Sequence, residues 1–205
     1  MNKPFSAACE RNRDPILDVL RQYIKPEHTH LLEIGSGTGQ HAVYFAPHFK
    51  HMTWITSDVP AHHLGMVMWF KEFKIPNISG PIRFKVGIDE FPKQPVNIVY
   101  TANTFHIMSW KNVKTLMKMF GHRLRKNSLV MIYGPFNYDG KFTSPSNEQF
   151  DRMLKEENPD SGIRSFEDIN KAMIKNGFEL LKDHEMPANN RMLIYKRLEH
   201  LSTPV

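Results

Sequence analysis

Cysteine is nearly missing from this chain, since its 205 residues contain only Cys9. A single cysteine excludes an internal disulfide framework and fits a reducing compartment. Long hydrophobic runs are also missing: no apolar stretch approaches the roughly 18 residues that a membrane-spanning helix needs, and residues 1–14 have no apolar signal-peptide centre. We therefore expect a cytoplasmic protein without a membrane partner.

The eleven histidines lack the spacing of a metal site. His62 and His63 are adjacent, so they would leave a helix in different directions, and no cysteine pair or His-Glu-x-x-His pattern accompanies them. We expect no metal. Cys9 has no neighbouring feature that marks it as a thiolate, so a small, half-buried residue is its simpler interpretation.

The net charge of +6 raises the question of a polyanionic partner. The densest basic cluster is KNVKTLMKMFGHRLRKN, residues 111–127, in which apolar residues recur at helical spacing and the Lys and Arg side chains point elsewhere. This pattern is typical of a core-packed helix with a solvated basic face. Because no aromatic residues interleave with the charges as a base-stacking surface would need, the sequence does not favour nucleic-acid binding.

Apolar strands alternate with helical patterns along the chain. The first helix is predicted to begin with Asp14 as its N-cap and Pro15 as its first residue. Helices are also predicted from about Gln40, over residues 64–73 and over residues 111–127. The strands predicted in this part are residues 30–34, 52–56, 82–86, 96–102 and 128–134. Continuous apolar strands separated by amphipathic helices indicate a parallel sheet covered on both faces.

The pattern changes after residue 134. Residues 144–158 predict a helix that opens with a capping box, Ser146 and Gln149. Residues 165–177 predict another, with Ser165 as N-cap and Gly177 as stop. Two strands follow, 178–186 and 191–198, and the loop between them is so short that they must run antiparallel. We predict one domain, residues 1–205, with a doubly wound, mostly parallel α/β sheet of seven strands that ends in an antiparallel hairpin.

The turn after the first predicted strand, EIGSGTG, contains three glycines. In an open α/β sheet this turn lies at the carboxyl edge of the strands, where ligands bind. Gly35, Gly37 and Gly39 let the backbone turn sharply and approach a ligand, and the following helix offers free N–H groups to an anion. Gln40 stands where the dinucleotide fingerprint has Gly or Ala, which argues against an NAD-dependent dehydrogenase. No Gly-Lys-Ser/Thr follows, so a Walker phosphate loop is excluded.

Asp58 ends the second apolar run, TWITSD. A carboxylate at this place can accept hydrogen bonds from both hydroxyls of a ribose and would repel a phosphate on that ribose. Alternatively, Asp58 caps the next helix ahead of Pro60. Together with the glycine turn, Asp58 favours an adenosine ligand that lacks a pyrophosphate.

The glycine turn, Asp58 and the terminal hairpin resemble those of class I S-adenosylmethionine-dependent methyltransferases. A closer resemblance covers nearly the whole chain: the strings KPFSAACERNRDPIL, SGTGQHAVYFAP, ANTFHI, YGPF, SNEQFD and MPANN are similar to an uncharacterised methyltransferase-like family of small cytoplasmic proteins. The resemblance implies a Rossmann-like methyltransferase fold and S-adenosylmethionine as the cofactor. It leaves the acceptor and the oligomeric state open.

The resemblance also implies roles for single residues in binding the cofactor. The turn, including Ser36 and Thr38 among its glycines, would border the methionine moiety, Glu33 would orient the turn, and Asp58 would bind the ribose. Many members of the superfamily hold the adenine amino group with an acid after strand three, where the nearest acid is Asp89. Asn103 follows strand four, where members line the amino-acid end of the cofactor, although a simple turn residue is the alternative.

A lid is a second implication of the resemblance. Glu10, Arg11, Asn12 and Arg13 precede the predicted first helix, and residues 1–14 would fold over the cofactor. Asn12 is the candidate ligand among them. A solvated polar stretch is the alternative interpretation.

Methyl transfer from a sulfonium is an in-line displacement, so the main task is to hold the nucleophile about 3 Å from the methyl carbon. His106, just beyond the fourth predicted strand, is the candidate base, with a hydrogen-bonded structural histidine as the alternative. Tyr133, the second catalytic candidate, and Asn137 straddle the end of strand five. Asn189 and Asn190 reach the acceptor if the hairpin loop folds back, although loop amides also simply satisfy turns.

The sequence thus favours an S-adenosylmethionine-dependent methyltransferase acting on a small molecule or a short peptide. A cofactor-binding protein without transferase activity is the first alternative, because no base is unambiguous. An RNA methyltransferase is the second. It would need the basic charges beside the pocket, whereas the predicted basic helix covers a face of the sheet.

Overall fold

The computed structural model describes residues 3–198. Within them, a mixed α/β fold has its main sheet of seven strands in the order β3-β2-β1-β4-β5-β9-β8. The pairs β3-β2, β2-β1 and β1-β4 are parallel, whereas β9 runs antiparallel to both β5 and β8. These pairings confirm the predicted mostly parallel sheet and its antiparallel hairpin. The chain divides into two compact units, one up to Thr101 and one from Ala102.

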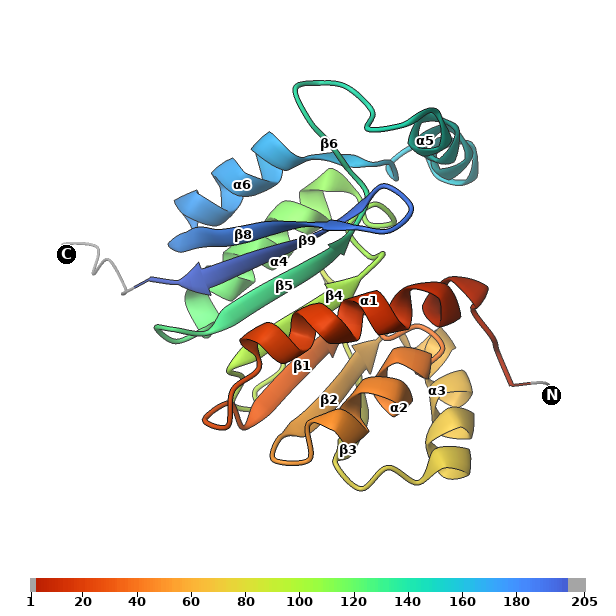
Figure 1. Cartoon of the computed structure of the whole chain (residues 1–205), viewed down its shortest axis with the longest axis vertical. Helices are drawn as coiled ribbons and strands as arrows, with labels where there is room; N and C mark the ends of the chain where they lie inside the picture. Colours follow the sequence, from red (N-terminus) through yellow and green to blue (C-terminus); the bar gives the residue numbers. More distant parts are fainter. Residues whose placement is uncertain (1–2, 199–205) are drawn as a thin grey trace. The chain divides into compact units, whose positions relative to one another are not determined.

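The first unit carries three α-helices and the parallel strands. Its elements are α1 (Ala7–Tyr23), β1 (His30–Ile34), α2 (Gln40–Phe45), a short 3-10 helix (Ala46–His48), β2 (Thr53–Asp58), α3 (Pro60–Phe73), β3 (Ile78–Arg83) and β4 (Ile98–Ala102), whose last residue begins the second unit. α1 packs against α2, and both lie in front of β1 and β2 in Figure 1. The first strand and the start of the second helix fall where the sequence predicts them.

Three fully buried aromatic side chains form the centre of this unit. Phe45 of α2, Trp54 of β2 and Tyr100 of β4 pack with ring centroids 5.7 to 6.0 Å apart. Each lies in edge or tilted contact with the other two, a geometry that aromatic pairs prefer. The cluster fastens α2 to the strands and so fixes the turn between β1 and α2.

Two predicted boundaries in this unit are wrong. α1 begins at Ala7, with Ser6 accepting a hydrogen bond from the Cys9 N–H, and Pro15 lies inside the helix. Proline is most common at the first helical position, so it marked a false start; buried contacts along α1 outweigh its missing donor. β3 begins at Ile78 and includes Pro81. A proline is tolerated there because β3 is an edge strand.

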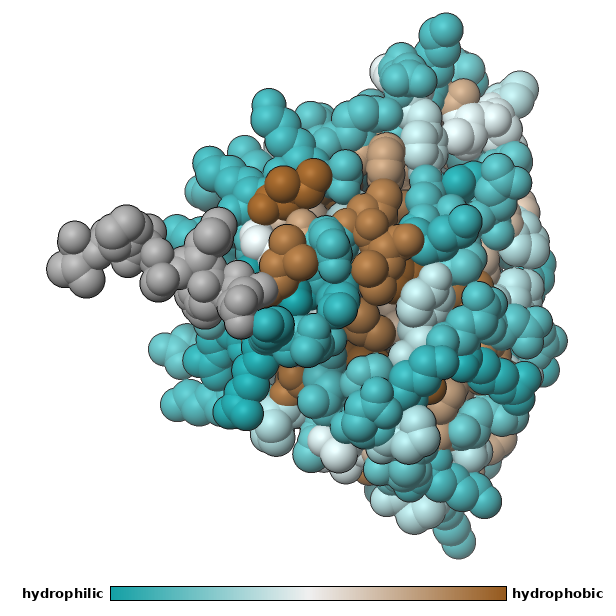
Figure 2. Space-filling model, turned by 60° about the vertical axis from the view of Figure 1, so that its left-hand side comes forward, coloured by the Kyte–Doolittle hydropathy of each residue, from teal (hydrophilic) through white to brown (hydrophobic). Residues whose placement is uncertain are grey.

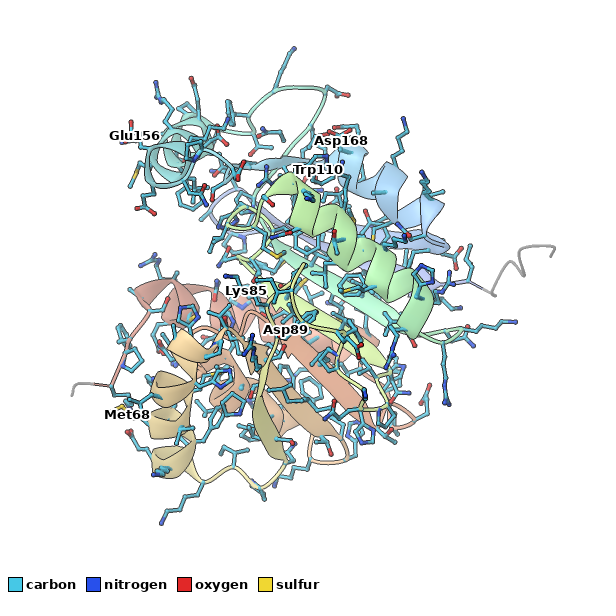
Figure 3. The ribbon with its side chains drawn as sticks, turned by 180° about the vertical axis from the view of Figure 1, so that it is seen from behind. Met68, Lys85, Asp89, Trp110, Glu156 and Asp168 are labelled. Carbon is cyan, nitrogen blue, oxygen red and sulfur yellow. The ribbon has the colours of Figure 1, made fainter. Side chains whose placement is uncertain are left out.

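The second unit contains α4 (Trp110–Arg123), β5 (Leu129–Gly134), β6 (Phe136–Asn137), α5 (Pro145–Glu157), β7 (Arg164–Ser165), α6 (Phe166–Lys175), β8 (Phe178–Met186) and β9 (Asn190–Arg197). β6 and β7 form a small parallel sheet that the sequence did not predict. α4 lies behind β5 in Figure 1 and in front of it in Figure 3.

The helices of the second unit follow the predicted patterns, with one exception. α4 buries Val113, Leu116, Met117 and Phe120, as its periodicity predicts. Ser165 caps α6 by accepting a hydrogen bond from the Asp168 N–H. The cap of α5, however, is Ser144 and not Ser146, because Pro145 occupies the first helical position, where proline fits best.

The surface in Figure 2 is mostly hydrophilic, with hydrophobic residues gathered in a band near the middle of that face. Within residues 3–198, no helix has the length and apolar character needed to cross a membrane.

Candidate functional site

The turn between β1 and α2 has its three glycines in left-handed conformations. Gly35, Gly37 and Gly39 have φ angles of 72°, 56° and 87°. A Cβ atom at Gly39 would lie 3.1 Å from side-chain atoms of Met66 and Phe70, so the turn packs closely on α3 there. A Cβ atom at Gly37 would meet nothing within 4 Å. Gly37 therefore leaves open space beside the backbone, where a ligand can approach.

Asp58 joins this turn to the end of β2. Its carboxylate accepts hydrogen bonds from the Gly37 N–H and the Val59 N–H, both at 2.7 Å, and lies 3.0 Å from Nδ1 of His62. The N-cap of α3 is Val59, which has no side-chain cap, so the helix-cap alternative for Asp58 is wrong. A carboxylate has about four acceptor positions. One position therefore stays available, and a second becomes available when His62 moves away.

Glu33 lies in β1 under the turn and is 2% exposed. Burial raises the pKa of its carboxyl to about 8 despite a hydrogen bond from Nε1 of Trp54, so the group is protonated at neutral pH. Its backbone carbonyl accepts from the hydroxyl of Ser57, whose own carbonyl accepts from Gly35 and Ser36. Ser57 thus fastens the turn to β2, a role that nothing in the sequence marked.

Gln40 has a structural role at the start of α2. Its carbonyl oxygen accepts from the Ser6 N–H at 2.6 Å and from the Thr38 hydroxyl at 3.0 Å, while its amide donates to Glu10. The sequence marked Gln40 only as a departure from the dinucleotide fingerprint. The structure shows that it ties the glycine turn to the segment before α1.

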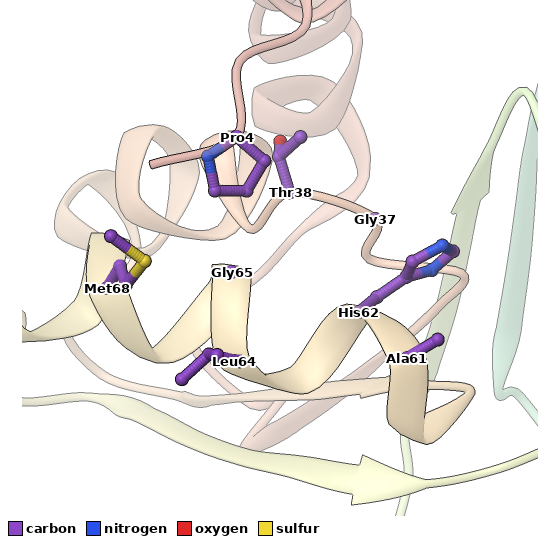
Figure 4. A pocket seen from close by; sticks show the side chains of 8 residues that line it. All are labelled: Pro4, Gly37, Thr38, Ala61, His62, Leu64, Gly65 and Met68. Atoms are coloured by element: carbon purple, nitrogen blue, oxygen red, sulfur yellow. The ribbon is translucent and has the colours of Figure 1, made fainter. Parts of the chain in front are cut away.

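A pocket of about 450 Å³ lies beside the turn (Figure 4). The segment before α1 forms one wall, held by a hydrogen bond from Nε1 of Trp69 to the Pro4 carbonyl and by the Lys3 ammonium, which lies 3.6 Å from the centre of a Trp69 ring. The lining is mostly apolar, with a hydroxyl and an imidazole as its polar side chains. It comprises Pro4, Gly37, Thr38, Ala61, His62, Leu64, Gly65 and Met68. Small-molecule sites have this size and mixture of groups.

Two further predicted cofactor residues have partners inside the first unit. The side-chain oxygen of Asn12 lies 2.8 Å from Nε2 of His41, a buried histidine whose pKa burial lowers to about 4. Residues 7–14 of the predicted lid belong to α1, residues 3–6 form a separate segment, and residues 1–2 lie outside the described part of the chain. Asp89 accepts from the Lys85 N–H, which lowers the pKa of its carboxyl, and from Nε of Arg83. Figure 3 labels Lys85 and Asp89 on the loop after β3.

The second unit brings three predicted residues close together. The Asn103 N–H donates to the Tyr133 carbonyl at 2.9 Å. A Cβ atom on Gly134, which ends β5, would lie 3.7 Å from Nδ1 of His106 and 3.8 Å from the Asn103 side-chain oxygen. His106 is 5% exposed. Burial, with a contribution from the Arg164 charge, lowers its pKa to about 4, so His106 is neutral at pH 7 and is a weak base.

The loop that carries His106 is held through its backbone. The carbonyl oxygens of residues 105–108 accept, in order, from Nε of Arg164, the Gly162 N–H, the Ser161 hydroxyl and Nη2 of Arg164. The first three bonds measure 3.1, 2.8 and 2.8 Å. Four consecutive carbonyls are thus satisfied by one short segment. No sequence pattern signals this contact, since the partners lie more than 50 residues apart.

The remaining residues predicted for the acceptor site differ in burial and in hydrogen bonding. Tyr133 is 3% exposed within β5. The Asn137 side-chain oxygen is buried without a hydrogen-bond partner in the described part of the chain. Asn190 donates to the Pro187 carbonyl within the hairpin loop, as a turn residue does, and Asn189 has a φ angle of 56°. Among residues 3–198, no group of three or more His, Cys, Asp or Glu side chains is placed to hold a metal ion.

A family model matches residues 3–197 of the chain, a range that includes the glycine turn and Asp58. The chain belongs to the DUF938 family. This family is described as a protein of unknown function.

Solved structures share the fold of this DUF938 chain. An O-methyltransferase family protein from Burkholderia thailandensis is 12% identical, with a TM-score of 0.80 over 94% of this chain and 58% of that one. The S-adenosylmethionine-dependent methyltransferase SibL, in its apo form, is 16% identical, with a TM-score of 0.78 over 94% and 56%. An O-methyltransferase family 2 protein from Planctomyces limnophilus DSM 3776, in complex with apigenin, is 13% identical, with a TM-score of 0.79 over 94% and 59%. The chain spans a little more than half of each, and the likeness shows a methyltransferase fold.

Proposed function

We propose that this DUF938 protein is an S-adenosylmethionine-dependent methyltransferase that acts on a small-molecule or short-peptide acceptor. The observation that carries the proposal is the 2.7 Å hydrogen bond from the Gly37 N–H to Asp58. This bond joins a left-handed glycine turn to the acid at the end of the neighbouring strand. The pair presents open backbone and a carboxylate at the same place, which suits a ribose beside a ligand without a pyrophosphate.

The residues of the turn fit the adenosine part of this cofactor. Gly37 has open space beside it, and Asp58 keeps acceptor positions for ribose hydroxyls. Burial keeps the Glu33 carboxyl protonated at neutral pH, so Glu33 adds no negative charge beneath the turn. We assign cofactor binding to Glu33, Asp58 and the turn from Gly35 through Ser36 and Thr38 to Gly39. Asp89, Asn103 and Asn12 are further proposed ligands.

When bound, the cofactor supplies a methyl group activated on a sulfonium. His106 is the proposed catalytic residue, and its neutral imidazole can accept a hydrogen bond from an acceptor hydroxyl. Its low pKa makes it a weak base, so we propose that positioning contributes more than proton transfer. Tyr133, Asn137, Asn189 and Asn190 are proposed to face the acceptor.

One observation supports a small acceptor: a structural neighbour was solved with apigenin. The pocket of about 450 Å³ beside the turn is proposed to hold the cofactor. The low pKa of His106 keeps a second candidate open: a protein that binds the cofactor and transfers no methyl group. A cytoplasmic location, a single functional domain and closure of the N-terminal segment over the cofactor stay predictions.

Isothermal titration with S-adenosylmethionine, S-adenosylhomocysteine and NADH tests the cofactor. We expect micromolar binding of the two sulfur ligands and no binding of NADH. Asp58→Asn should lose at least about 30-fold in affinity, since hydrogen bonds to a charged group contribute roughly 1.5–3 kcal/mol each. Asp18→Asn, which removes an exposed carboxylate of α1, is the matched control and should bind as the wild type does.

Absence of binding by either sulfur ligand would contradict the proposal, and so would NADH binding of equal strength. Consumption of methyl-labelled cofactor with a panel of small hydroxylated acceptors then separates the two candidates. A transferase passes the label to an acceptor, whereas a silent binding protein retains the cofactor unchanged.

A further inference from the structure

The positive charge of this chain is concentrated in one stretch. Residues 103–138 contain six Lys and Arg residues and no Asp or Glu, and the net charge of the whole chain is +6. Outside this stretch, basic and acidic residues are equal in number. The excess charge therefore belongs to α4 and the residues just after it.

Three exposed lysines form a line on α4. Lys111, Lys114 and Lys118 follow one another at spacings of three and four residues, which keeps them on one face of α4, away from its buried apolar face. The other exposed basic residues of this stretch lie off that face or beyond Leu124, whose extended backbone ends the helix: Arg123, Arg125 and Lys126. Within residues 3–198, none of the three lysines makes an ion pair with an acid. We call these three residues the α4 stripe; α4 itself, with 14 residues, is about 21 Å long.

Other helices of the described chain are balanced or acidic. α1 has three basic and three acidic residues, α6 has two of each, and α5 has two basic and four acidic ones. α4 has four basic residues and no acid. An ordinary solvated helix face mixes both signs, so the α4 stripe differs from the remaining helical surface.

The end of α6 extends the basic surface. The Arg197 guanidinium donates to the carbonyls of Gly121 in α4 and of Asn176, which caps α6, so the last turns of the two helices lie together. Lys175, the last residue of α6, is exposed there. The acidic residues of α6 are in its first turn, at the opposite end of that helix from Lys175.

The side chains around the stripe narrow the choice of partner. No large exposed hydrophobic residue lies on the described residues 110–126, so the stripe offers no apolar anchor for a protein interface or a membrane. The ring of Trp110, at the start of α4, already lies under a cation, since Nζ of Lys114 is 5.8 Å from the ring centroid. No series of aromatic rings is present on residues 110–126 to stack single-stranded bases. Phosphate groups, by contrast, need only regularly placed cations.

We propose that the α4 stripe binds the phosphate backbone of double-stranded nucleic acid without reading its sequence. In this contact, the lysine ammonium groups of the stripe pair with successive phosphates. No residue of the stripe is a proposed ligand of the cofactor or the acceptor, so the proposal goes beyond methyl transfer and does not depend on it. Since only the backbone is contacted, RNA and DNA duplexes should both bind. Affinity should fall steeply with salt, because each neutralised phosphate releases counterions.

Fluorescence anisotropy with labelled RNA and DNA duplexes of about 20 base pairs, in roughly 50 mM salt, tests this proposal. The variant Lys111→Gln/Lys114→Gln/Lys118→Gln should lose at least about 10-fold in affinity, and the slope of log affinity against log salt should fall by about 2.7, since each contact contributes roughly 0.9. The control Lys50→Gln/Lys71→Gln/Lys93→Gln removes equal charge from exposed sites of the first unit. It should lose no more than about 2-fold.

Three outcomes would overturn the proposal. The wild type could fail to bind either duplex, both triple variants could lose affinity equally, or poly-glutamate or vesicles containing phosphatidylserine could bind as tightly as the duplexes. Thermal melting by circular dichroism confirms that each variant is folded. The stripe variant should keep its affinity for S-adenosylhomocysteine, so failure of this proposal and failure of the cofactor assignment are separate results.

Discussion

The glycine turn, residues 35–39, and the histidine loop, residues 103–108, are held in place by different means. The turn depends on its own backbone conformations and on the end of β2, where Ser57 and Asp58 accept its N–H groups. The loop depends on residues 161–164, which satisfy four of its carbonyls. The turn is therefore a local structure, whereas the loop is correct only when a distant segment has folded against it.

This difference separates the two halves of the proposed reaction. The turn offers open backbone and a carboxylate, groups that bind a common cofactor. The loop offers a buried, neutral histidine whose surroundings come from elsewhere in the second unit. Cofactor binding should thus be sensitive to backbone changes in the turn, and the histidine loop to the loss of long-range contacts.

The largest expected effect is that of Gly39→Ala in the turn. The new Cβ would lie 3.1 Å from Met66 and Phe70 and adopt a φ of 87°, so we expect a loss of about 2–4 kcal/mol in the free energy of unfolding, measured with urea. Gly37→Ala is the matched control. It has a φ of 56° but no atom within 4 Å, so only the backbone cost of about 1–2 kcal/mol applies. Equal losses in the two variants would show that packing on α3 is unimportant.

Arg164→Gln should destabilise the histidine loop, residues 103–108. It removes the donors to the carbonyls of residues 105 and 108, and a buried acceptor left unpaired costs about 1–3 kcal/mol. We expect a loss of about 2 kcal/mol in unfolding free energy and faster hydrogen exchange across residues 103–108. Arg152→Gln, an exposed change in α5, should stay within about 0.5 kcal/mol. Unchanged exchange in Arg164→Gln would mean that the loop holds itself.

The buried carboxyl of Glu33 should make the free energy of unfolding depend on pH. Its pKa in the folded protein, about 8, lies above the ordinary value of 4.5, so the native state keeps a proton that the unfolded state loses. Stability should therefore fall as the pH rises from about 4.5 to 8, by about 1 kcal/mol between pH 6 and 7. Glu33→Gln keeps an acceptor for Trp54 and should remove this slope. Identical urea midpoints against pH for both proteins would contradict the assignment.

The smallest expected effect is that of His62→Ala on cofactor affinity. His62 is half exposed, and its Nδ1 lies 3.0 Å from Asp58, so its removal frees one acceptor position for a ribose hydroxyl. We expect S-adenosylhomocysteine to bind about 2- to 5-fold more tightly, as suits an exposed pair. His63→Ala is the control, because His63 contacts the backbone carbonyl of Asp58 and not its carboxylate. Weaker binding in His62→Ala would show that His62 orients the carboxylate.

The same contrast explains how much could be predicted from the sequence. The strand before the turn, the turn itself and the buried face of α4 follow from local spacing, and each is found as predicted. The predicted start of α1 at Pro15 is wrong because helix packing overrides the local preference of proline for the first helical position. The predicted strand 82–86 is wrong because β3 is an edge strand that tolerates Pro81. The roles of Gln40 and Arg164 arise from partners more than 25 residues away, and periodicity contains no information about such pairs.

The most direct test of the central claim is a nuclear magnetic resonance titration of the nitrogen-15-labelled protein with S-adenosylhomocysteine. If the turn and Asp58 hold the cofactor, the amide resonances of Gly35, Gly37, Gly39 and Asp58 will shift together and saturate at one equivalent of ligand. If those resonances stay in place, or if the shifts occur only away from the turn, the glycine turn does not bind the cofactor and the proposed function is wrong.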